Sequence, residues 1–202
     1  MPNRYRDLSP TTLLSPVPVV LLSCGTQEKP NAITIAWVGT VCSHPPMVSV
    51  SIRPSRYSYE LIRNSGEFVV NLPDVRFAKS EDYCGVRSGR DEDKLAACGL
   101  TAVPMPGLEC APALDGFPAH LGCKVRQIIP LGSHDLFLSE IVSVRVRDDL
   151  FVADGSMRLD RADLLCYSHG VYQRAEGALG FFGWSVARPD VLDRRMEELR
   201  KR

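Results

Sequence analysis

The stretch Asn31-Ala-Ile-Thr-Ile-Ala-Trp37 is rich in β-branched residues and follows the turn chemistry of Gly25-Thr-Gln-Glu-Lys-Pro30. Such a run predicts a strand, here over 32–38. Three other short segments have the same character and predict a meander of antiparallel strands: Val17–Cys24, Met47–Ile52 and Glu67–Leu72. Within the first stretch, the polar Asn31 and Thr34 and the aromatic Trp37 are spaced to border a planar heterocycle.

Helical segments and two longer strands surround this meander. Helices are predicted where a polar capping residue opens a run and glycine ends it: 58–66 behind Ser58, 74–84 behind Asp74 and 91–98 behind Asp91. A proline-rich loop over 101–118 leads to strands over 120–129 and 135–147, and an amphipathic helix ends the chain over 189–202. Because strands crowd the chain before residue 150, the pattern favours a β-barrel with flanking helices over a βαβ sheet.

Composition narrows the class of protein. The 202 residues fit a single domain, with a barrel core over about 15–185. Lys plus Arg and Asp plus Glu both number 24, so no net charge attracts nucleic acid or an anionic membrane. The apolar run Val17–Leu22 is too short for a membrane span or a secretion signal, and we expect a cytoplasmic protein. Seven cysteines without a Cys-x-x-Cys pair argue against a disulfide framework.

A second segment concentrates donors for an anion. Ser51-Ile-Arg-Pro-Ser-Arg-Tyr-Ser58 holds two guanidiniums and three serine hydroxyls beside a predicted helix start, which are the groups that a phosphate monoester needs. The candidate ligands here are Ser51, Arg53, Ser55, Arg56 and Ser58. The loop Gly85-Val-Arg-Ser-Gly-Arg-Asp-Glu-Asp-Lys94 adds Ser88, Gly89 and Lys94. We expect Arg53 to contribute more than Arg87, and a surface salt bridge is the alternative for Arg56 and Arg87.

In their order and spacing these segments resemble the flavin reductase-like family, which includes the flavoredoxins. The resemblance extends from about Ser15 to about Trp184 and is supported by Pro45-Pro46, Gly66–Asn71 and Gly132-Ser-His134. It implies a six-stranded antiparallel split β-barrel of Greek-key topology that binds FMN. The positions that match the lining of the flavin ring are Asn31, Ala32, Thr34, Trp37, Thr40 and Cys42. A buried apolar thiol is the alternative for Cys42.

The resemblance also implies a reaction. Related flavin reductases place a histidine near the flavin and the nicotinamide, which makes His134 the candidate contact on the substrate side, with an idle turn histidine as the alternative. NADH or NADPH would pass a hydride to flavin N5 in a homodimer whose cleft lies near the subunit interface. A flavoredoxin-like electron carrier, which exchanges electrons with a redox protein and has no nicotinamide site, remains open. So does a binding module for another phosphorylated or planar ligand.

Other chemistries lack their sequence patterns. The Gly85–Gly89 loop is neither a Gly-x-Gly-x-x-Gly fingerprint nor a P-loop. Cys42 and His44 have no second ligand pair at useful spacing, so we expect no metal. There is no Gly-x-Ser-x-Gly elbow and no convincing carboxylate pair, so hydrolysis has little support.

Overall fold

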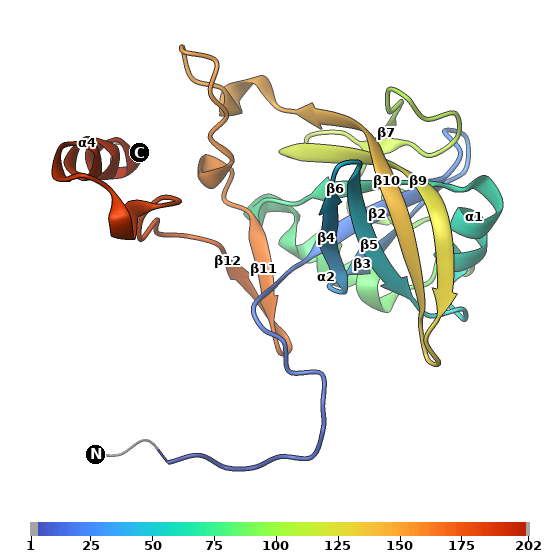
Figure 1. Cartoon of the computed structure of the whole chain (residues 1–202). Helices are drawn as coiled ribbons and strands as arrows, with labels where there is room; N and C mark the ends of the chain where they lie inside the picture. The colour runs from blue at the N-terminus through green and yellow to red at the C-terminus, as the bar shows by residue number, and fades with distance from the viewer. Residues whose placement is uncertain (1–3, 201–202) are drawn as a thin grey trace.

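The computed structural model describes residues 4–200, and most of them surround one seven-stranded antiparallel sheet that curls into a barrel (Figure 1). The strand order is β3-β2-β6-β9-β10-β5-β4. In chain order the strands are β2 Val20–Gly25, β3 Pro30–Ile35, β4 Val38–Ser43, β5 Pro46–Ile52, β6 Glu67–Leu72, β9 Ala119–Pro130 and β10 Asp135–Val146.

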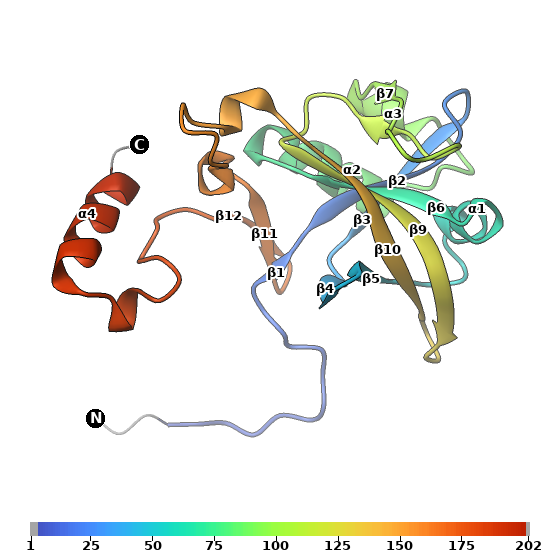
Figure 2. The ribbon, with the colours of Figure 1, turned by 45° about the horizontal axis from the view of Figure 1, so that its top comes forward.

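The two edge strands of this sheet are consecutive in the chain. β3 pairs with β2 at one edge and β4 pairs with β5 at the other, with only Ala36 and Trp37 between β3 and β4. The Ser51 N–H donates to the Trp37 carbonyl at 2.9 Å and holds β5 against this corner. β3 and β5 share no ladder within the described residues, so the barrel is split where the corner lies (Figure 2).

The split-barrel class predicted from the sequence is confirmed, with two differences in the strands. The main sheet has seven strands rather than six, because β4 is partly exposed and mixes valine with glycine, threonine and serine, so that no alternating pattern marks it. The early strands also do not form a simple meander, since β6 lies beside β2 while the β9–β10 hairpin separates β6 from β5. Both long strands lie within one residue of their predicted bounds.

Short strands add two small sheets. β1 Val17–Pro18, β11 Leu165–Ser168 and β12 Val171–Arg174 form a three-stranded sheet in the order β1-β11-β12. The predicted strand Val17–Cys24 is therefore divided, because its first residues pair with β11 and only its later residues join the barrel. β7 Ala102–Val103 pairs with β8 Ala113–Leu114 inside the segment predicted to be a loop.

Strand alternation divides the apolar residues between two layers. Leu22, Val50 and Phe137 point into the barrel, where α1 Tyr57–Ser65 contributes the fully buried Ile62. The opposite face of β2 and β3 carries Leu21 and Ala32 and is covered by α2 Ala78–Val86 and α3 Lys94–Cys98. Successive residues of a strand point to opposite faces, so β2 and β3 supply both layers.

The helix starts differ from those predicted. α1 begins at Tyr57, one residue before the predicted cap Ser58, and no side chain caps it, while the Ser58 hydroxyl accepts a hydrogen bond from Asn31. Asp93, rather than Asp91, caps α3 by accepting from the Ala96 N–H at 3.1 Å. The segment 74–84 begins as the 3₁₀ turn η1 Val75–Phe77 behind Asp74 and continues as α2, with Gly85 inside that helix. The other 3₁₀ turns are η2 Asp148–Leu150, η3 Leu159–Arg161 and η4 Trp184–Val186.

Both ends of the described chain project from the barrel (Figures 1 and 2). The predicted C-terminal helix is present as α4 Pro189–Arg200, with its last two predicted residues outside the described range. No helix in residues 4–200 is long and apolar enough to cross a membrane.

Candidate functional site

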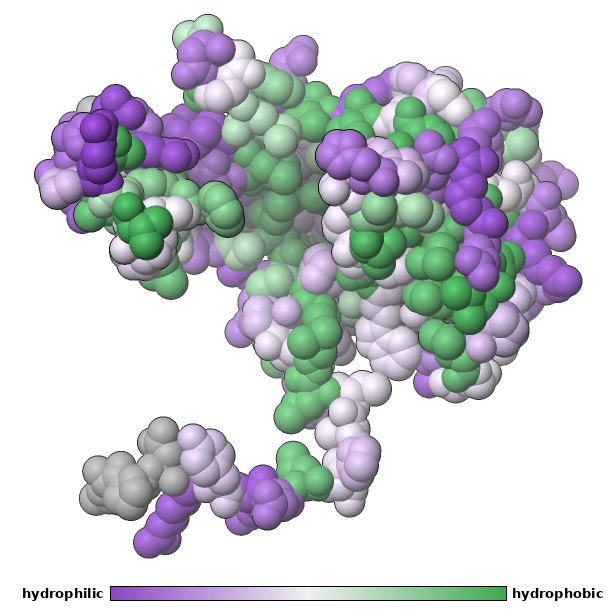
Figure 3. Space-filling model, viewed as in Figure 1, coloured by the Kyte–Doolittle hydropathy of each residue, from purple (hydrophilic) through white to green (hydrophobic). Residues whose placement is uncertain are grey.

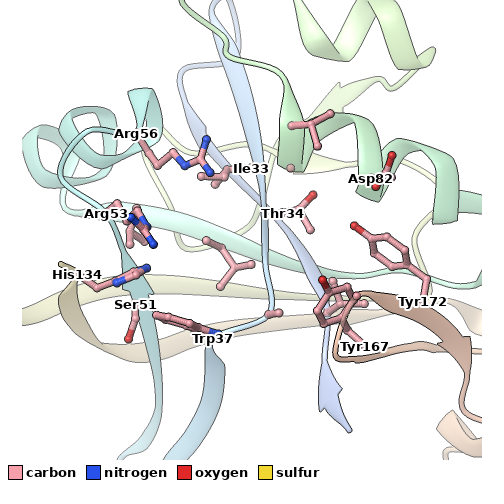
Figure 4. A pocket seen from close by; sticks show the side chains of 17 residues that line it. Ile33, Thr34, Trp37, Ser51, Arg53, Arg56, Asp82, His134, Tyr167 and Tyr172 are labelled. Carbon is pink, nitrogen blue, oxygen red and sulfur yellow. The ribbon is translucent and has the colours of Figure 1, made fainter. Parts of the chain in front are cut away.

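A cavity of about 390 Å³ opens at the split of the barrel (Figure 4). Its walls come from β3 and the Ala36–Trp37 corner, the end of β5, helix α2, the β9–β10 turn and the β11–β12 hairpin. Ligand pockets commonly measure about 300–1,000 Å³, so this cavity is large enough for a planar heterocycle.

The two ends of this cavity differ in charge. Arg53, Arg56 and His134 lie on one side of Thr34, and Asp82, Tyr167 and Tyr172 lie on the other (Figure 4). Burial, followed by the charge of Asp82, raises the pKa of Tyr172 to about 12, so this phenol stays protonated at neutral pH. The cavity therefore has a cationic end and an end with a carboxylate and two phenols.

Trp37 and His134 form an aromatic shelf at the cationic end. Their ring centroids are 4.2 Å apart and the planes are inclined by 42°. The Ser133 hydroxyl lies 2.9 Å from Nδ1 of His134 and restrains the imidazole. Burial and the charges of Arg53 and Arg56 lower the pKa of His134, so the ring is neutral at pH 7.

A second cavity, of about 200 Å³, lies beside the first and shares Ile33 and Arg56 with it. Polar and charged groups from two loops and two helices line it: Ser55, Ser58, Arg87, Ser88, Gly89, Arg90 and Lys94. Ser55 and Ser58 flank the uncapped start of α1, where backbone N–H groups lack a side-chain acceptor.

Lys94 is the most constrained cation of the second cavity. The residue is 4% exposed, and its Nζ donates to the carbonyls of Cys84 at 3.2 Å and Arg87 at 3.3 Å. No carboxylate of the described chain lies within ion-pair distance of it. Burial lowers the pKa of Lys94 because a desolvated ammonium is costly. An anion in this cavity would provide the missing charge partner.

Contacts behind the second cavity hold its loops together. Nδ2 of Asn31 donates to the Ser58 hydroxyl at 2.7 Å, and the Arg90 guanidinium donates to the Ser55 carbonyl at 2.9 Å. A Cβ at Gly89 would collide with Oδ1 of Asn31 and would approach the Tyr57 ring to 2.9 Å. Only glycine therefore lets the 85–90 loop approach the strand this closely.

The family follows from the sequence as a whole. A sequence model described as the flavin reductase like domain matches residues 13–176. This chain belongs to the flavin reductase family. The match spans the barrel and the β11–β12 hairpin, and so includes both cavities.

Three relatives illustrate what this chain is similar to. The solved structure of flavoredoxin from Desulfovibrio vulgaris (Miyazaki F) is 30% identical, with a TM-score of 0.81, and covers 88% of this chain and 97% of that protein. The NADPH-flavin oxidoreductase of Streptomyces viridifaciens is 28% identical over 148 residues, which are 72% of this chain and 75% of that protein. The NADH:FMN oxidoreductase of Rhodococcus erythropolis is 29% identical over 134 residues, which are 66% of this chain and 65% of that protein.

Most candidate residues from the sequence meet at the two cavities of this flavin reductase-family protein. The main cavity is lined by Thr34, Trp37, Ser51, Arg53, Arg56 and His134. The second is lined by Ser55, Arg56, Ser58, Ser88, Gly89 and Lys94. Arg53 was predicted to face the phosphate, but it lines only the main cavity. Arg87, the lesser candidate, lines the second cavity and lies 3.8 Å from Glu92.

Four predicted positions do not line either cavity. Asn31 is buried behind the second cavity and positions Ser58. Ala32 is buried under α2 with the outer apolar layer. Thr40 and Cys42 lie along β4, beyond the corner at Trp37, and a strand advances about 3.3 Å per residue. Contact of Thr40 and Cys42 with a flavin stays a prediction, and Cys42 donates to the His44 carbonyl at 3.4 Å.

No residue at the anionic end of the main cavity is among the candidates from the sequence. Asp82 comes from α2, while Tyr167 and Tyr172 come from the β11–β12 hairpin. These residues belong to no recognisable motif, and tertiary folding alone brings them together. The short strand pattern around 165–174 was the one signal that could have drawn attention to this hairpin.

Proposed function

We propose that this protein binds FMN and acts as an oxidoreductase that takes electrons from NADH or NADPH. The observation that carries the proposal is Lys94, a buried ammonium without a carboxylate partner in the described chain, lining a cavity beside a ring-sized one. One ligand with a planar ring and a phosphate matches both cavities. The names of the Streptomyces and Rhodococcus relatives support a flavin and a nicotinamide donor.

The residues present fit FMN as follows. Lys94, Arg56 and Arg87 supply positive charge for the phosphate, and Ser55, Ser58 and Ser88 supply hydroxyl donors. The start of α1 adds backbone N–H groups that favour an anion. Thr34, Ser51 and the Trp37 shelf would orient the ring in the main cavity. The bound flavin would supply hydride chemistry, while the chain positions the ring and excludes water from one of its faces.

An electron carrier is the second candidate, favoured by the similarity to flavoredoxin. The purified protein should be yellow, and its visible absorption should bleach within seconds when NADPH or NADH is added without oxygen. Bleaching by either donor supports the oxidoreductase. Retention of FMN with no bleaching by either donor, but with reduction by dithionite, would favour the carrier. Failure of the apoprotein to bind FMN in a fluorescence titration would contradict both candidates.

We also propose that the protein is a homodimer in which the projecting ends of one copy pack on the other. Both projecting segments carry exposed apolar side chains: Leu14 is 85% exposed, Leu179 85%, Phe182 104% and Val186 86%. Figure 3 shows apolar surface on these segments and on the adjoining face of the barrel. Exposed apolar side chains in such number are costly in water, and a second copy supplies a matching surface by two-fold symmetry.

Replacing Leu179 and Phe182 together with serine is expected to shift the protein towards monomer. Light scattering at micromolar concentration should report a dimer for the unmodified chain and a lower mass for the variant. A matched control replaces Leu131, which is 61% exposed in the turn between β9 and β10 and lies away from the projecting ends, with serine and should leave the mass unchanged. A monomeric mass for the unmodified protein with FMN bound would contradict the dimer.

A further inference from the structure

We propose that Cys84 and Cys98 form an oxidation site on the helices that flank the phosphate loop, and that the disulfide between them weakens the binding of FMN. The phosphate loop is residues 87–93, which join α2 to α3 and carry Arg87, Ser88 and Gly89 into the second cavity. The oxidant is hydrogen peroxide, and the modification is one reversible disulfide. The effect on FMN rests on the proposed function, whereas the oxidation site itself does not.

The two thiols lie together between α2 and α3. Cys84 is in the last turn of α2, and Cys98 is the last residue of α3. Both contribute to the outer apolar layer with Leu95 and Phe117. Burial raises the pKa of Cys84 to about 12, and the charge of Cys98 and a hydrogen bond between the two side chains add to this shift. Both cysteines are free, so two thiols within hydrogen-bond reach are available to be joined.

The two cysteines differ in access, and this difference gives each of them a role. Cys84 is 1% exposed, whereas Cys98 is partly exposed, and oxidation of a thiol depends on access. The Cys98 sulfur takes one oxygen of the peroxide and becomes a sulfenic acid, and the other oxygen leaves as water. The Cys84 sulfur then bonds to the Cys98 sulfur, and the Cys84 proton leaves with the sulfenic hydroxyl as a second water. The two thiols lose two electrons and two protons, and one peroxide becomes two waters.

Lys94 connects this oxidation site to the second cavity. It is the first residue of α3, one turn before Cys98, and its Nζ donates to the Cys84 carbonyl at 3.2 Å. Cys84 itself lines the second cavity. Sulfurs joined in a disulfide lie closer than sulfurs in a hydrogen bond, so oxidation draws the end of α3 towards α2. The Lys94 ammonium then shifts relative to the cavity, and its hydrogen bond to a phosphate weakens.

Two other cysteines provide comparisons. The charge of Cys24 also acts on Lys94, but Cys24 is 0% exposed and accepts a hydrogen bond from Nδ2 of Asn31 at 3.8 Å. Cys24 is therefore the competing partner for Cys98. Cys166 is partly exposed, as Cys98 is, but it lies in β11 of the three-stranded sheet. Cys166 is therefore the matched control.

The first measurement maps the cross-link in the FMN-loaded protein. The protein is treated with hydrogen peroxide, alkylated, digested with trypsin and Glu-C, and analysed by mass spectrometry. These proteases cleave after Lys, Arg and Glu, so Cys84 and Cys98 are each the only cysteine of their peptide. We expect one cross-linked pair of these two peptides, which dithiothreitol separates. Cys98→Ser should abolish the cross-link, and Cys166→Ser should leave it unchanged.

The second measurement is the FMN affinity of the apoprotein, from quenching of FMN fluorescence before and after peroxide treatment and desalting. We expect oxidation to weaken FMN by about 10-fold, the lower end of the range for a lost charge-assisted hydrogen bond. Dithiothreitol should restore the affinity. Cys98→Ser should bind FMN equally well before and after peroxide, and Cys166→Ser should respond as the unmodified chain does.

Three outcomes would overturn the inference. Peroxide that oxidises Cys166 without joining Cys84 to Cys98 would show that the pair is not an oxidation site. A cross-link from Cys98 to Cys24 would assign the wrong partner. A cross-link between Cys84 and Cys98 that leaves FMN affinity unchanged would separate this site from the cofactor. If the reduced, unmodified apoprotein does not bind FMN, the proposed function fails, and the peptides still decide whether the oxidation site exists.

Discussion

The free energy of unfolding is expected to fall by about 1.4 kcal/mol per pH unit between neutral pH and about pH 8. Replacing Glu81 with glutamine should abolish this fall. Glu81 lies on the inner side of α2 and is 0% exposed. Neither of its carboxyl oxygens has a hydrogen-bond partner in the described chain. Burial raises the pKa of Glu81 from 4.5 to about 8, and the nearby Thr34 hydroxyl donates to the backbone carbonyl of Glu81 rather than to its carboxyl group.

The sign follows from proton binding. Between the unfolded pKa of 4.5 and the folded pKa of about 8, the folded chain holds a proton on Glu81 that the unfolded chain has lost. The stabilisation by protonated Glu81 is therefore fully present below pH 4.5 and is lost as the pH rises through about 8. Below pH 6.5, His120 changes the free energy of unfolding in the opposite direction, because burial lowers its pKa from 6.5 to about 4. The window from pH 6.5 to 8 isolates Glu81 from this histidine.

Urea unfolding followed by tryptophan fluorescence at pH 6.5, 7 and 7.5 measures the slope. The unmodified apoprotein should lose stability across this series, and Glu81→Gln should not, because glutamine does not titrate. Glu60→Gln is the matched control, since Glu60 is an exposed residue of α1 that pairs with Arg63. Equal slopes in Glu81→Gln and the unmodified chain would show that Glu81 is charged, or solvated, in the fold.

The strands that could be read from the sequence are those with one buried face. β9 and β10 are long and contain alternating stretches, and their predicted bounds hold within one residue. β4 is partly exposed and mixes glycine, threonine and serine with valine, so no periodic pattern marks it. The order of strands in the sheet depends on pairing between distant segments, such as β6 with β2 and β9, which local patterns do not encode.

The site shows the same division between local and tertiary information. Donors clustered within 51–58 and 85–94 could be read as an anion site, and the fold brings most of them to one cavity. The different roles of Arg53 and Arg56 could not be read in this way. These residues are three positions apart, yet the turn between β5 and α1 directs Arg53 to the main cavity alone while Arg56 borders both. Asp82 and the two tyrosines required the complete fold.

Lys94→Met is expected to move cofactor affinity and apoprotein stability in opposite directions. Methionine has a similar length and no charge, so the variant removes the buried ammonium and its hydrogen bonds but preserves packing beside Cys84. Loss of a charge-assisted contact to phosphate should cost about 1.5–3 kcal/mol, or roughly 10- to 100-fold in FMN affinity. The apoprotein should gain on the order of 1 kcal/mol, because no desolvated, unpaired cation remains.

Quenching of FMN fluorescence measures the affinity, and urea unfolding of the apoprotein measures the stability. Lys29→Met is the control, because Lys29 is exposed in the turn between β2 and β3 and should change neither quantity. A loss of both affinity and apoprotein stability in Lys94→Met would make Lys94 a structural residue that ties α3 to the carbonyls at the end of α2. Unchanged FMN affinity would mean that the phosphate lies elsewhere. Lower FMN affinity together with higher apoprotein stability would show that the buried ammonium destabilises the apoprotein and binds the anionic group of the ligand.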